Sequence, residues 1–222
     1  MDKQYSQKTN TRLQLEGYAG LERCKNLIIS HFPDNIDVFI EPFAGLGRIT
    51  ELVTANTYHL NDMSDYAIET LRKKFPTNEK GMMDSWIGLK TRNYTIDQMD
   101  FRDFIIKYMQ MENAFIFCDP PWRKNIYKNN DGERMKKAFR NPRKPVFTEH
   151  NIVAYYDALL KLLPNCKCKW MITSDRAETE NGKRLQKSDY FNKTEQAPDG
   201  SKFFGRLPAV RLCANYFKQG DM

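Results

Sequence analysis

The chain has 222 residues, of which 41% are hydrophobic and 13% are aromatic, and its formal net charge is +7. A chain of this length suits one domain and buries roughly 70% of its unfolded surface, so its core needs no disulfide scaffold. The hydrophobic content excludes general disorder, and no segment approaches the ~18 apolar residues of a membrane span. The polar first residues and the five scattered cysteines favour a reduced, cytosolic protein without a signal peptide or a membrane partner.

Helices are predicted where apolar residues recur at helical spacing, and strands where short runs are rich in β-branched and aromatic residues. Residues 1–15 form a loose polar arm. The elements predicted in the first third of the chain are a helix over 21–32, a strand over 38–43, a helix near 49–55, a strand over 57–63 and a helix over 65–75 that Ser64 caps.

The remainder of the chain continues the alternation after residues 77–92, which carry no distinct pattern. Its predicted elements are strands over 93–100, 114–122, 167–176, 190–195 and 210–218, and helices over 101–110, 151–163 and 177–186. Strands that alternate with helices of this length indicate an α/β fold, with a sheet covered by helices on both faces. Ligands of such sheets bind at the carboxyl ends of the strands.

Acidic side chains are predicted at several of these carboxyl ends. They are Glu41, Asp62, Asp100, Asp119 and Asp175. Because the carboxyl ends of parallel strands meet at one edge of a sheet, we expect a ligand site there.

The segment EPFAGLGR, residues 41–48, lies between a predicted strand and a predicted helix. Gly45 and Gly47 allow a tight turn and a close approach of the backbone to a ligand. Glu41 would repel a pyrophosphate but could pair with a cationic group. Asp62, about twenty residues further on, suits a hydrogen bond with ribose hydroxyls, although an acid that begins a helix is an equal alternative.

The segment CDPPW, residues 118–122, ends another predicted strand. Consecutive prolines cannot continue a central strand, and they fix the direction of the backbone carbonyls. Asp119 and the Pro120 carbonyl could each accept one N–H of a base amino group, and Trp122 could stack on its ring. A structural turn after an edge strand is the alternative.

Together, EPFAGLG, NDMSD, DFRDF and CDPPW resemble, in order, the motifs of Dam-type, alpha-class adenine-specific DNA methyltransferases. GYAGLERCKNLIISHFP, FTEHNIVAYYDAL and MITSDR extend the likeness over residues 17–176. The resemblance implies a Rossmann-like class I methyltransferase fold with a mostly parallel seven-stranded sheet. It also implies S-adenosylmethionine as methyl donor, the 6-amino group of adenine in DNA as acceptor, and a cytoplasmic protein that is prokaryotic or phage-encoded.

The resemblance implies a role for each matching residue. Glu41 would face the ammonium group of the methyl donor, Asp62 would hold its ribose and Asp100 its adenine amino group. The implied cofactor-binding residues are Tyr18, Ala19, Glu41, Phe43, Gly45, Gly47, Asp62, Asp100 and Phe101. The residues implied to hold the target adenine are Asp119, Pro120, Pro121 and Trp122. No metal ligand is expected, because Cys166 and Cys168 lack a second pair.

The sequence departs from the family at three places. The family's Gly-Gly-Lys reads Gly20-Leu21-Glu22, and Trp122 stands where Dam-type enzymes usually have Tyr. The third departure is the short distance from Gly47 to Asp119, which leaves no room for a sizeable target-recognition insertion. We therefore expect a single domain over residues 1–222, with target choice resting on residues 77–92, on a basic loop or on a partner subunit.

The basic loop spans residues 123–148, and between Arg123 and Lys144 it has nine basic and two acidic residues. Such a charge excess favours nucleic-acid phosphates, although a solvated loop is an equal prior interpretation. The candidate nucleic-acid-binding residues are Arg123, Lys124, Lys128, Lys136, Lys137, Arg140, Arg143 and Lys144. DNA is the favoured partner. The alternatives are RNA, a protein glutamine, against which Asp119 argues, and a degenerate nucleic-acid-binding subunit.

Overall fold

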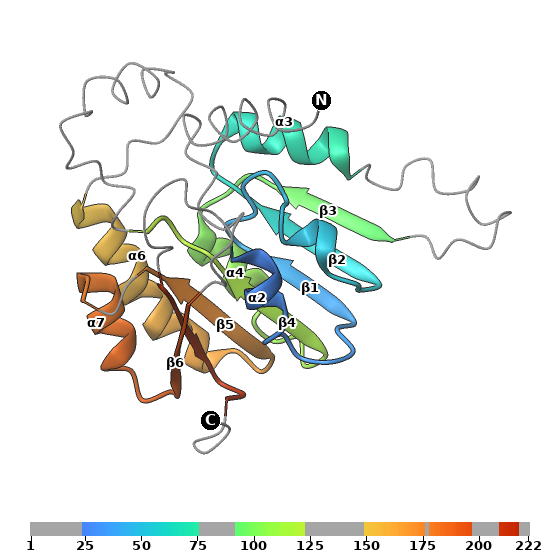
Figure 1. Ribbon diagram of the computed structural model, residues 1–222. Helices are drawn as coiled ribbons and strands as arrows, with labels where there is room; N and C mark the ends of the chain where they lie inside the picture. Colours follow the sequence, from blue (N-terminus) through green and yellow to red (C-terminus); the bar gives the residue numbers. More distant parts are fainter. Residues whose placement is uncertain (1–23, 76–91, 123–148, 176–177, 197–208, 218–222) are drawn as a thin grey trace, which may run out of the picture.

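The computed structural model describes residues 24–75, 92–122, 149–175, 178–196 and 209–217. A seven-stranded sheet runs through the molecule (Figure 1). Its strands are β1 (Val38–Glu41), β2 (Thr57–Asn61), β3 (Asn93–Asp97), β4 (Ala114–Cys118), β5 (Lys169–Ser174), β6 (Asn192–Gln196) and β7 (Ala209–Ala214). The N-terminal arm predicted at 1–15 and the basic loop at 123–148 lie outside the described residues.

The strand order in the sheet is β3-β2-β1-β4-β5-β7-β6. Strands β1 to β5 pair in parallel, whereas β7 is antiparallel to both β5 and β6. From β1 the chain builds outward through β2 and β3, and then returns to the other side of β1 to form β4. Such a reversal leaves a crevice between the carboxyl ends of the two central strands, where α/β proteins bind ligands.

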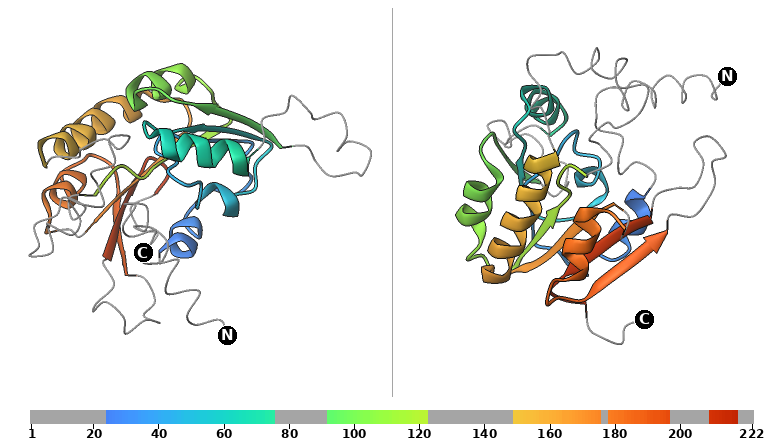
Figure 2. Two further views of the ribbon diagram at one scale, coloured as in Figure 1. Left: turned by 90° about the horizontal axis from the view of Figure 1, so that it is seen from above. Right: turned by 90° about the vertical axis from the view of Figure 1, so that its left-hand side faces the viewer.

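Helices cover both faces of the sheet, as the alternation of elements predicted. They are α2 (Lys25–Ile29), α3 (Asp65–Lys74), α4 (Phe101–Tyr108), α6 (Glu149–Leu162) and α7 (Glu180–Gln186), with short 3-10 turns η1 (Thr50–Leu52) and η5 (Leu163–Asn165). Side chains of α2 and α3 pack in one hydrophobic cluster, and those of α4, α6 and α7 pack in a second cluster. The two sets of helices lie on opposite sides of the sheet (Figure 2).

The central strands supply both hydrophobic clusters, because successive side chains of a strand point to opposite faces. Phe39 of β1 and Phe115 of β4 belong to the cluster under α2 and α3. Ile40 and Ile116, one residue further on, belong to the cluster under α4, α6 and α7. Strands β1 and β4 are buried throughout, which is why they read as continuous apolar runs rather than as an alternating pattern.

Several predicted boundaries were wrong. The helix expected near 49–55 is only the 3-10 turn η1, because the backbone is already extended at Val53, with ψ of 137°. Strand β3 ends at Asp97, and Asp100 is instead the N-cap of α4. Strand β4 ends at Cys118, before the two prolines, which lack the N–H donors of a ladder. No helix among the described residues is long and apolar enough to cross a membrane.

The packing of Gly47 yields a first prediction. Its φ is +68°, and an added Cβ would lie 2.5 Å from Phe75 Cε2 and 3.0 Å from Leu71 Cδ2. Gly47→Ala should therefore lower the free energy of unfolding by about 1–3 kcal/mol through backbone strain and overpacking. In urea denaturation, Gly47→Ala should cost less stability in a Phe75→Leu background than in the wild type, because the smaller side chain relieves the contact. Strictly additive effects of the two substitutions would contradict the contact.

Candidate active site at the carboxyl edge of the sheet

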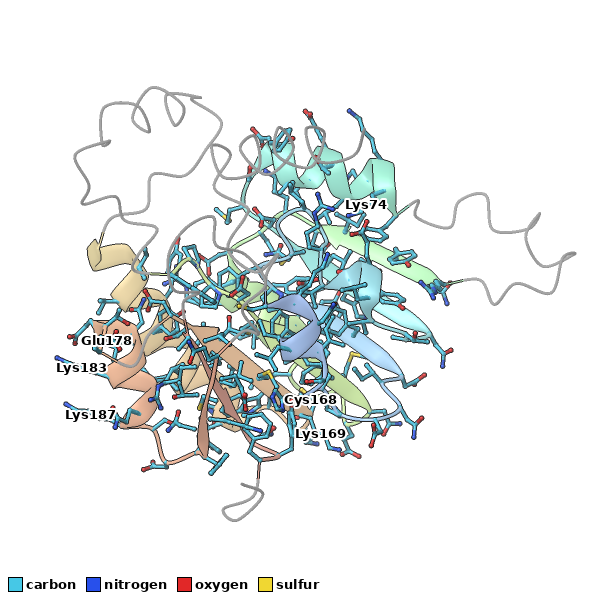
Figure 3. All side chains as sticks on the ribbon, in the orientation of Figure 1. Lys74, Cys168, Lys169, Glu178, Lys183 and Lys187 are labelled. Carbon is cyan, nitrogen blue, oxygen red and sulfur yellow. The ribbon has the colours of Figure 1, made fainter. Side chains whose placement is uncertain are left out.

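The glycine-containing turn follows β1 and is held by hydrogen bonds from three directions. Gly45 and Gly47 both have positive φ, 52° and 68°, as expected of a turn that only glycine adopts readily. The Gly45 N–H donates to Asp62 Oδ2 at 2.9 Å, and the Ala44 N–H donates to the Asn61 carbonyl at 2.8 Å. Lys74 Nζ extends from α3 (Figure 3) and donates to the Leu46 carbonyl at 2.9 Å. The turn is therefore fixed by groups at the end of β2, directly after it and in α3.

Asn61 is the side chain that joins the carboxyl ends of three strands. It is fully buried, and its Nδ2 donates to the Pro42 carbonyl at 3.1 Å and to the Met99 carbonyl at 3.0 Å. Its Oδ1 accepts the Met99 N–H at 3.0 Å. The sequence analysis missed this residue. A signal for it was present, because a polar residue that ends a buried strand needs partners within the protein.

Asp62 orients the backbone around the turn. Besides the Gly45 N–H, its carboxylate accepts the Ser64 N–H at 2.8 Å. Burial raises the pKa of Asp62 to about 6, although the backbone hydrogen bonds oppose the shift. The side chain keeps partial exposure. Since a carboxylate offers about four acceptor sites, Asp62 retains capacity for ligand hydroxyls while it holds the turn.

Glu41 is a buried carboxyl group at the end of β1. Only 2% of the residue is exposed, and the Thr50 hydroxyl donates to its Oε2. Burial, with smaller contributions from the charges of Asp119 and Asp62, raises the pKa of Glu41 to about 8, against the lowering effects of the Thr50 hydrogen bond and of Lys74. At neutral pH Glu41 is therefore mostly protonated. A cationic ligand group beside it would favour the ionised form.

Three aromatic rings form a cluster next to these carboxyl groups. Phe43 follows β1, Phe101 begins α4 and Tyr155 lies in α6. The ring centroids are 5.0 Å apart for Phe43 and Phe101, 5.2 Å for Phe101 and Tyr155, and 6.2 Å for Phe43 and Tyr155. Phe43 and Tyr155 are half-buried. This aromatic cluster, Phe43–Phe101–Tyr155, offers an apolar surface for a planar ring. Tyr155 was missed because it comes from a helix far along the chain.

Asp100 is engaged with Arg102. Its Oδ1 accepts the Arg102 backbone N–H at 2.8 Å and the Arg102 Nε–H at 2.7 Å, and its Oδ2 accepts Arg102 Nη2 at 2.6 Å. These hydrogen bonds lower the pKa of Asp100. The carboxylate therefore caps α4 and pairs with a cation in this structure. Contact with the amino group of a ligand would require it to share or exchange these donors.

Asp119 is fixed by side chains of two other positions. Its Oδ1 accepts the Trp122 indole N–H at 2.9 Å and also the Thr173 hydroxyl. Thr173 is buried near the end of β5, and its carbonyl accepts the Tyr156 hydroxyl at 2.8 Å. Thr173 was not predicted from the sequence, since its proximity to Asp119 follows from the pairing of β4 with β5.

Trp122 was expected to offer a stacking face, but the residue is only 2% exposed and belongs to the core cluster under α2 and α3. Stacking on a base would require the indole ring to move from this position. Pro120 is buried and Pro121 is partly exposed. Tyr18, Ala19 and all eight candidate nucleic-acid-binding residues of the basic loop lie outside the described residues.

The carboxyl edge therefore brings together Glu41, Phe43, Asp62, Phe101 and Asp119, which the sequence analysis assigned to one site. Within the described ranges, no group of three or more His, Cys, Asp or Glu side chains is arranged to hold a metal ion. All five cysteines are buried free thiols, and burial raises the pKa of Cys118 well above its ordinary value. A thiolate nucleophile beside Asp119 is thus disfavoured.

The chain matches no protein-family model and none of the curated proteins. Among solved structures it resembles the methyltransferase domain of a bacterial CtHen1, with a TM-score of 0.52 and 10% identity over 86% of this chain and 97% of that chain. An rRNA methylase from Streptococcus thermophilus has a TM-score of 0.47 and 10% identity over 87% and 95% of the two chains. A proposed methyltransferase from Streptococcus mutans, solved with SAH, has a TM-score of 0.48 and 14% identity over 88% and 97%. The first likeness and the strand order show a Rossmann-like class I methyltransferase fold.

The buried carboxyl groups yield a second prediction, on stability. The pKa of Glu41 is raised from its ordinary value of 4.5 to about 8 in the folded chain. At a pH between these two values, Glu41 keeps its proton in the folded chain and has lost it in the unfolded chain. Raising the pH through this interval therefore favours unfolding, by ~1.4 kcal/mol for each pH unit. Asp62 adds to the same trend between its ordinary pKa of 3.8 and about 6.

Urea denaturation between pH 5 and pH 9 checks this expectation. Glu41→Gln should remove most of the decline in stability above pH 6 and leave the variant more stable than the wild type at pH 8. Glu69→Gln, which changes an exposed glutamate of α3, is the matched control and should keep the wild-type profile. Parallel pH profiles for wild type and Glu41→Gln would contradict the burial of an uncompensated carboxyl group.

Proposed function

We propose that this chain is an S-adenosylmethionine-dependent methyltransferase that modifies the exocyclic 6-amino group of adenine in nucleic acid, with DNA as the favoured substrate. The observation that carries the proposal is the fixed Asp119 carboxylate beside the buried carboxyl group of Glu41. The two residues follow neighbouring strands, since β1 and β4 pair in parallel with Ile40 opposite Ile116. An acceptor for an amine and an acceptor for a cation thus meet at one edge.

The residues present fit the proposed cofactor. Glu41 is a buried acid whose one described hydrogen-bond partner is the neutral Thr50 hydroxyl, so it suits the ammonium group of a methionine moiety. Asp62 suits ribose hydroxyls, and the aromatic cluster Phe43–Phe101–Tyr155 suits an adenine ring. S-adenosylmethionine would supply an electrophilic methyl group. Asp100 fits less well, because Arg102 already occupies both of its oxygens.

Asp119 would act on the substrate amine. The lone pair of an adenine amino group is delocalised into the ring, which makes it a poor nucleophile. A carboxylate that accepts one amine N–H, together with a rigid carbonyl such as that of Pro120, would draw the nitrogen toward tetrahedral geometry. Because Thr173 and Trp122 hold Asp119 in place, little reorganisation would be needed when the amine arrives. Such preorganised acceptors lower a barrier more than mobile ones do.

The choice of DNA rests on the motif order that resembles Dam-type enzymes and on the basic residues between Arg123 and Lys144. RNA is the second candidate, supported by Trp122 and by the missing recognition insertion. A transfer assay with a tritiated methyl donor on single- and double-stranded DNA and RNA, followed by identification of the labelled nucleoside, tests the proposal. Label in RNA alone would favour the second candidate. No label in any substrate would favour a degenerate binding subunit.

The third prediction concerns cofactor binding and protons. If the ammonium group of S-adenosylmethionine pairs with Glu41, binding at pH 7 should release a proton, because the pKa of Glu41 falls from about 8 when a cation approaches. The calorimetric enthalpy should therefore depend on the ionisation enthalpy of the buffer at pH 7. Glu41→Gln should bind the cofactor more weakly and release fewer protons on binding. Any proton that the ligand itself exchanges is common to both proteins, so the variant also serves as the reference. If the binding enthalpies of the two proteins differed by the same amount in every buffer, the assignment of Glu41 would be contradicted.

The fourth prediction separates chemistry from cofactor binding. Asp119→Ala should reduce methyl transfer by more than about 100-fold, as expected for the loss of a preorganised polar group. Thr173→Val should reduce it less, because Asp119 then keeps its bond to Trp122, and Thr173→Ser should restore most of the rate. Cofactor affinity should change little in all three variants. Equal loss of transfer and of cofactor affinity in folded Asp119→Ala would contradict the role of Asp119.

A further inference from the structure

Arg211 of β7 is a buried cation without a counter-charge in the part of the chain that the structure describes. The residue is 8% exposed, and its Nε finds no hydrogen-bond partner among the described residues. No carboxylate of the described ranges is among the groups that shift the pKa of its guanidinium, which burial lowers and nearby Cys213 raises. An arginine stays charged in proteins, so this arrangement costs stability unless a ligand supplies the missing negative charge.

The position of Arg211 in the sheet brings it to the carboxyl edge. It pairs with Ser174, the last residue of β5, on one side and with Thr194 of β6 on the other. Paired residues of adjacent strands project to the same face. Ser174 is buried, whereas Thr194 is exposed. Arg211 thus lies on a face whose neighbouring residue is buried on the β5 side and exposed on the β6 side.

Helix α7 covers this face and contributes a second unpartnered group. Cys213, two residues after Arg211 on the same face, has its Sγ 3.3 Å from Ser188 Oγ just beyond α7, and it clusters with Leu185. Asn181 lies one turn before Leu185, at the N-terminal end of α7, and α7 begins shortly after β5, whose last residue pairs with Arg211. Asn181 is fully buried, and within the described ranges neither its Nδ2 nor its Oδ1 has a hydrogen-bond partner. Buried amides in this state are rare.

Arg184 of the same helix differs from Arg211, because carboxylates compensate its charge. Its Nε donates to Asp157 at 2.8 Å and its Nη1 donates to Glu180, so two carboxylates compensate one guanidinium. Lys183 and Lys187 point outward from α7 (Figure 3) and are exposed to solvent. Glu180 of α7 is engaged with Arg184, and Asp175, which follows β5, accepts the Thr179 hydroxyl at 2.6 Å.

We propose that Arg211 and Asn181 bind a phosphate group, and that this phosphate belongs to the nucleic-acid substrate. A guanidinium and an amide N–H donor complement phosphate oxygens. Arg211 lies two strands from β4, about 10 Å away at the usual strand spacing, so a phosphate there lies within reach of a base held by Asp119. The assignment to nucleic acid rests on the proposed function, whereas the anion site itself does not.

Nuclear magnetic resonance of arginine side chains tests the site without any enzymatic turnover. The Nε–H signal of Arg211, assigned by its loss in Arg211→Lys, should shift when inorganic phosphate is added, and also with an oligothymidylate that contains no adenine. Sodium chloride at equal ionic strength should leave it unchanged. A shift with phosphate alone would overturn the assignment to nucleic acid. No shift with either probe would overturn the site itself, whether or not the protein methylates nucleic acid.

Binding of a fluorescent oligonucleotide at several salt concentrations gives the second readout. Arg211→Met should flatten the log–log salt dependence by roughly 0.7–0.9, the change expected for one lost phosphate contact. Arg184→Gln, which also removes one charge from this region, should leave the slope unchanged. Arg211→Met should melt at or above the wild-type temperature, because it removes an uncompensated buried charge. A lower melting temperature together with an unchanged slope would show that Arg211 is structural and overturn the proposal.

Discussion

The side-chain amide of Asn61 is the constraint on which the candidate site depends. Parallel strands expose unpaired backbone groups where they end, and those groups must find partners if the edge is to be partly buried. Asn61 supplies partners for the Pro42 carbonyl after β1 and for both backbone groups of Met99 before α4. One residue therefore sets the relative positions of the three segments that carry Glu41, Asp62 and Asp100. A shift of β2 by one residue would move this amide out of the edge and release all three.

The constraint has an electrostatic cost. It brings Glu41, Asp62 and Asp119 together in a poorly solvated edge, where the pKa of Glu41 rises to about 8 and that of Asp62 to about 6. Backbone N–H donors from Gly45 and Ser64 offset part of this cost at Asp62. At Glu41 the compensation is weaker, since its described hydrogen bond comes from a neutral hydroxyl. Stability lost at a group that a ligand can compensate is characteristic of a binding site rather than of a structural core.

The sequence predicted well which segments form strands and which form helices along the chain, because apolar runs and helical spacing are local signals. It also predicted that Glu41, Asp62 and Asp119 share an edge, since that follows from parallel strands alone. Thr173, Tyr155 and Lys74 were not predicted, because each meets the site through a tertiary contact that the local sequence does not reveal. The burial of Trp122 was likewise not predicted, because an aromatic residue after a strand end fits a ligand surface and a core equally well. Asp100 was predicted at a strand end, although it is the N-cap of α4. An acidic residue between a strand and a helix fits a helix cap and a ligand site equally well in sequence.

The polar groups of this edge fall into two kinds, and the difference has physical meaning. Asn61 and Thr173 make their side-chain hydrogen bonds within the described chain, so their effect is to hold other groups in position. Glu41, Asn181 and Arg211 are as deeply buried but poorly compensated. A folded chain can tolerate such groups only where other packing offsets their cost. Because Glu41 of β1 is acidic while Arg211 of β7 is basic, these two positions of the edge suit ligand groups of opposite charge. A bound cofactor with an ammonium group and a substrate with a phosphate group would satisfy both at once.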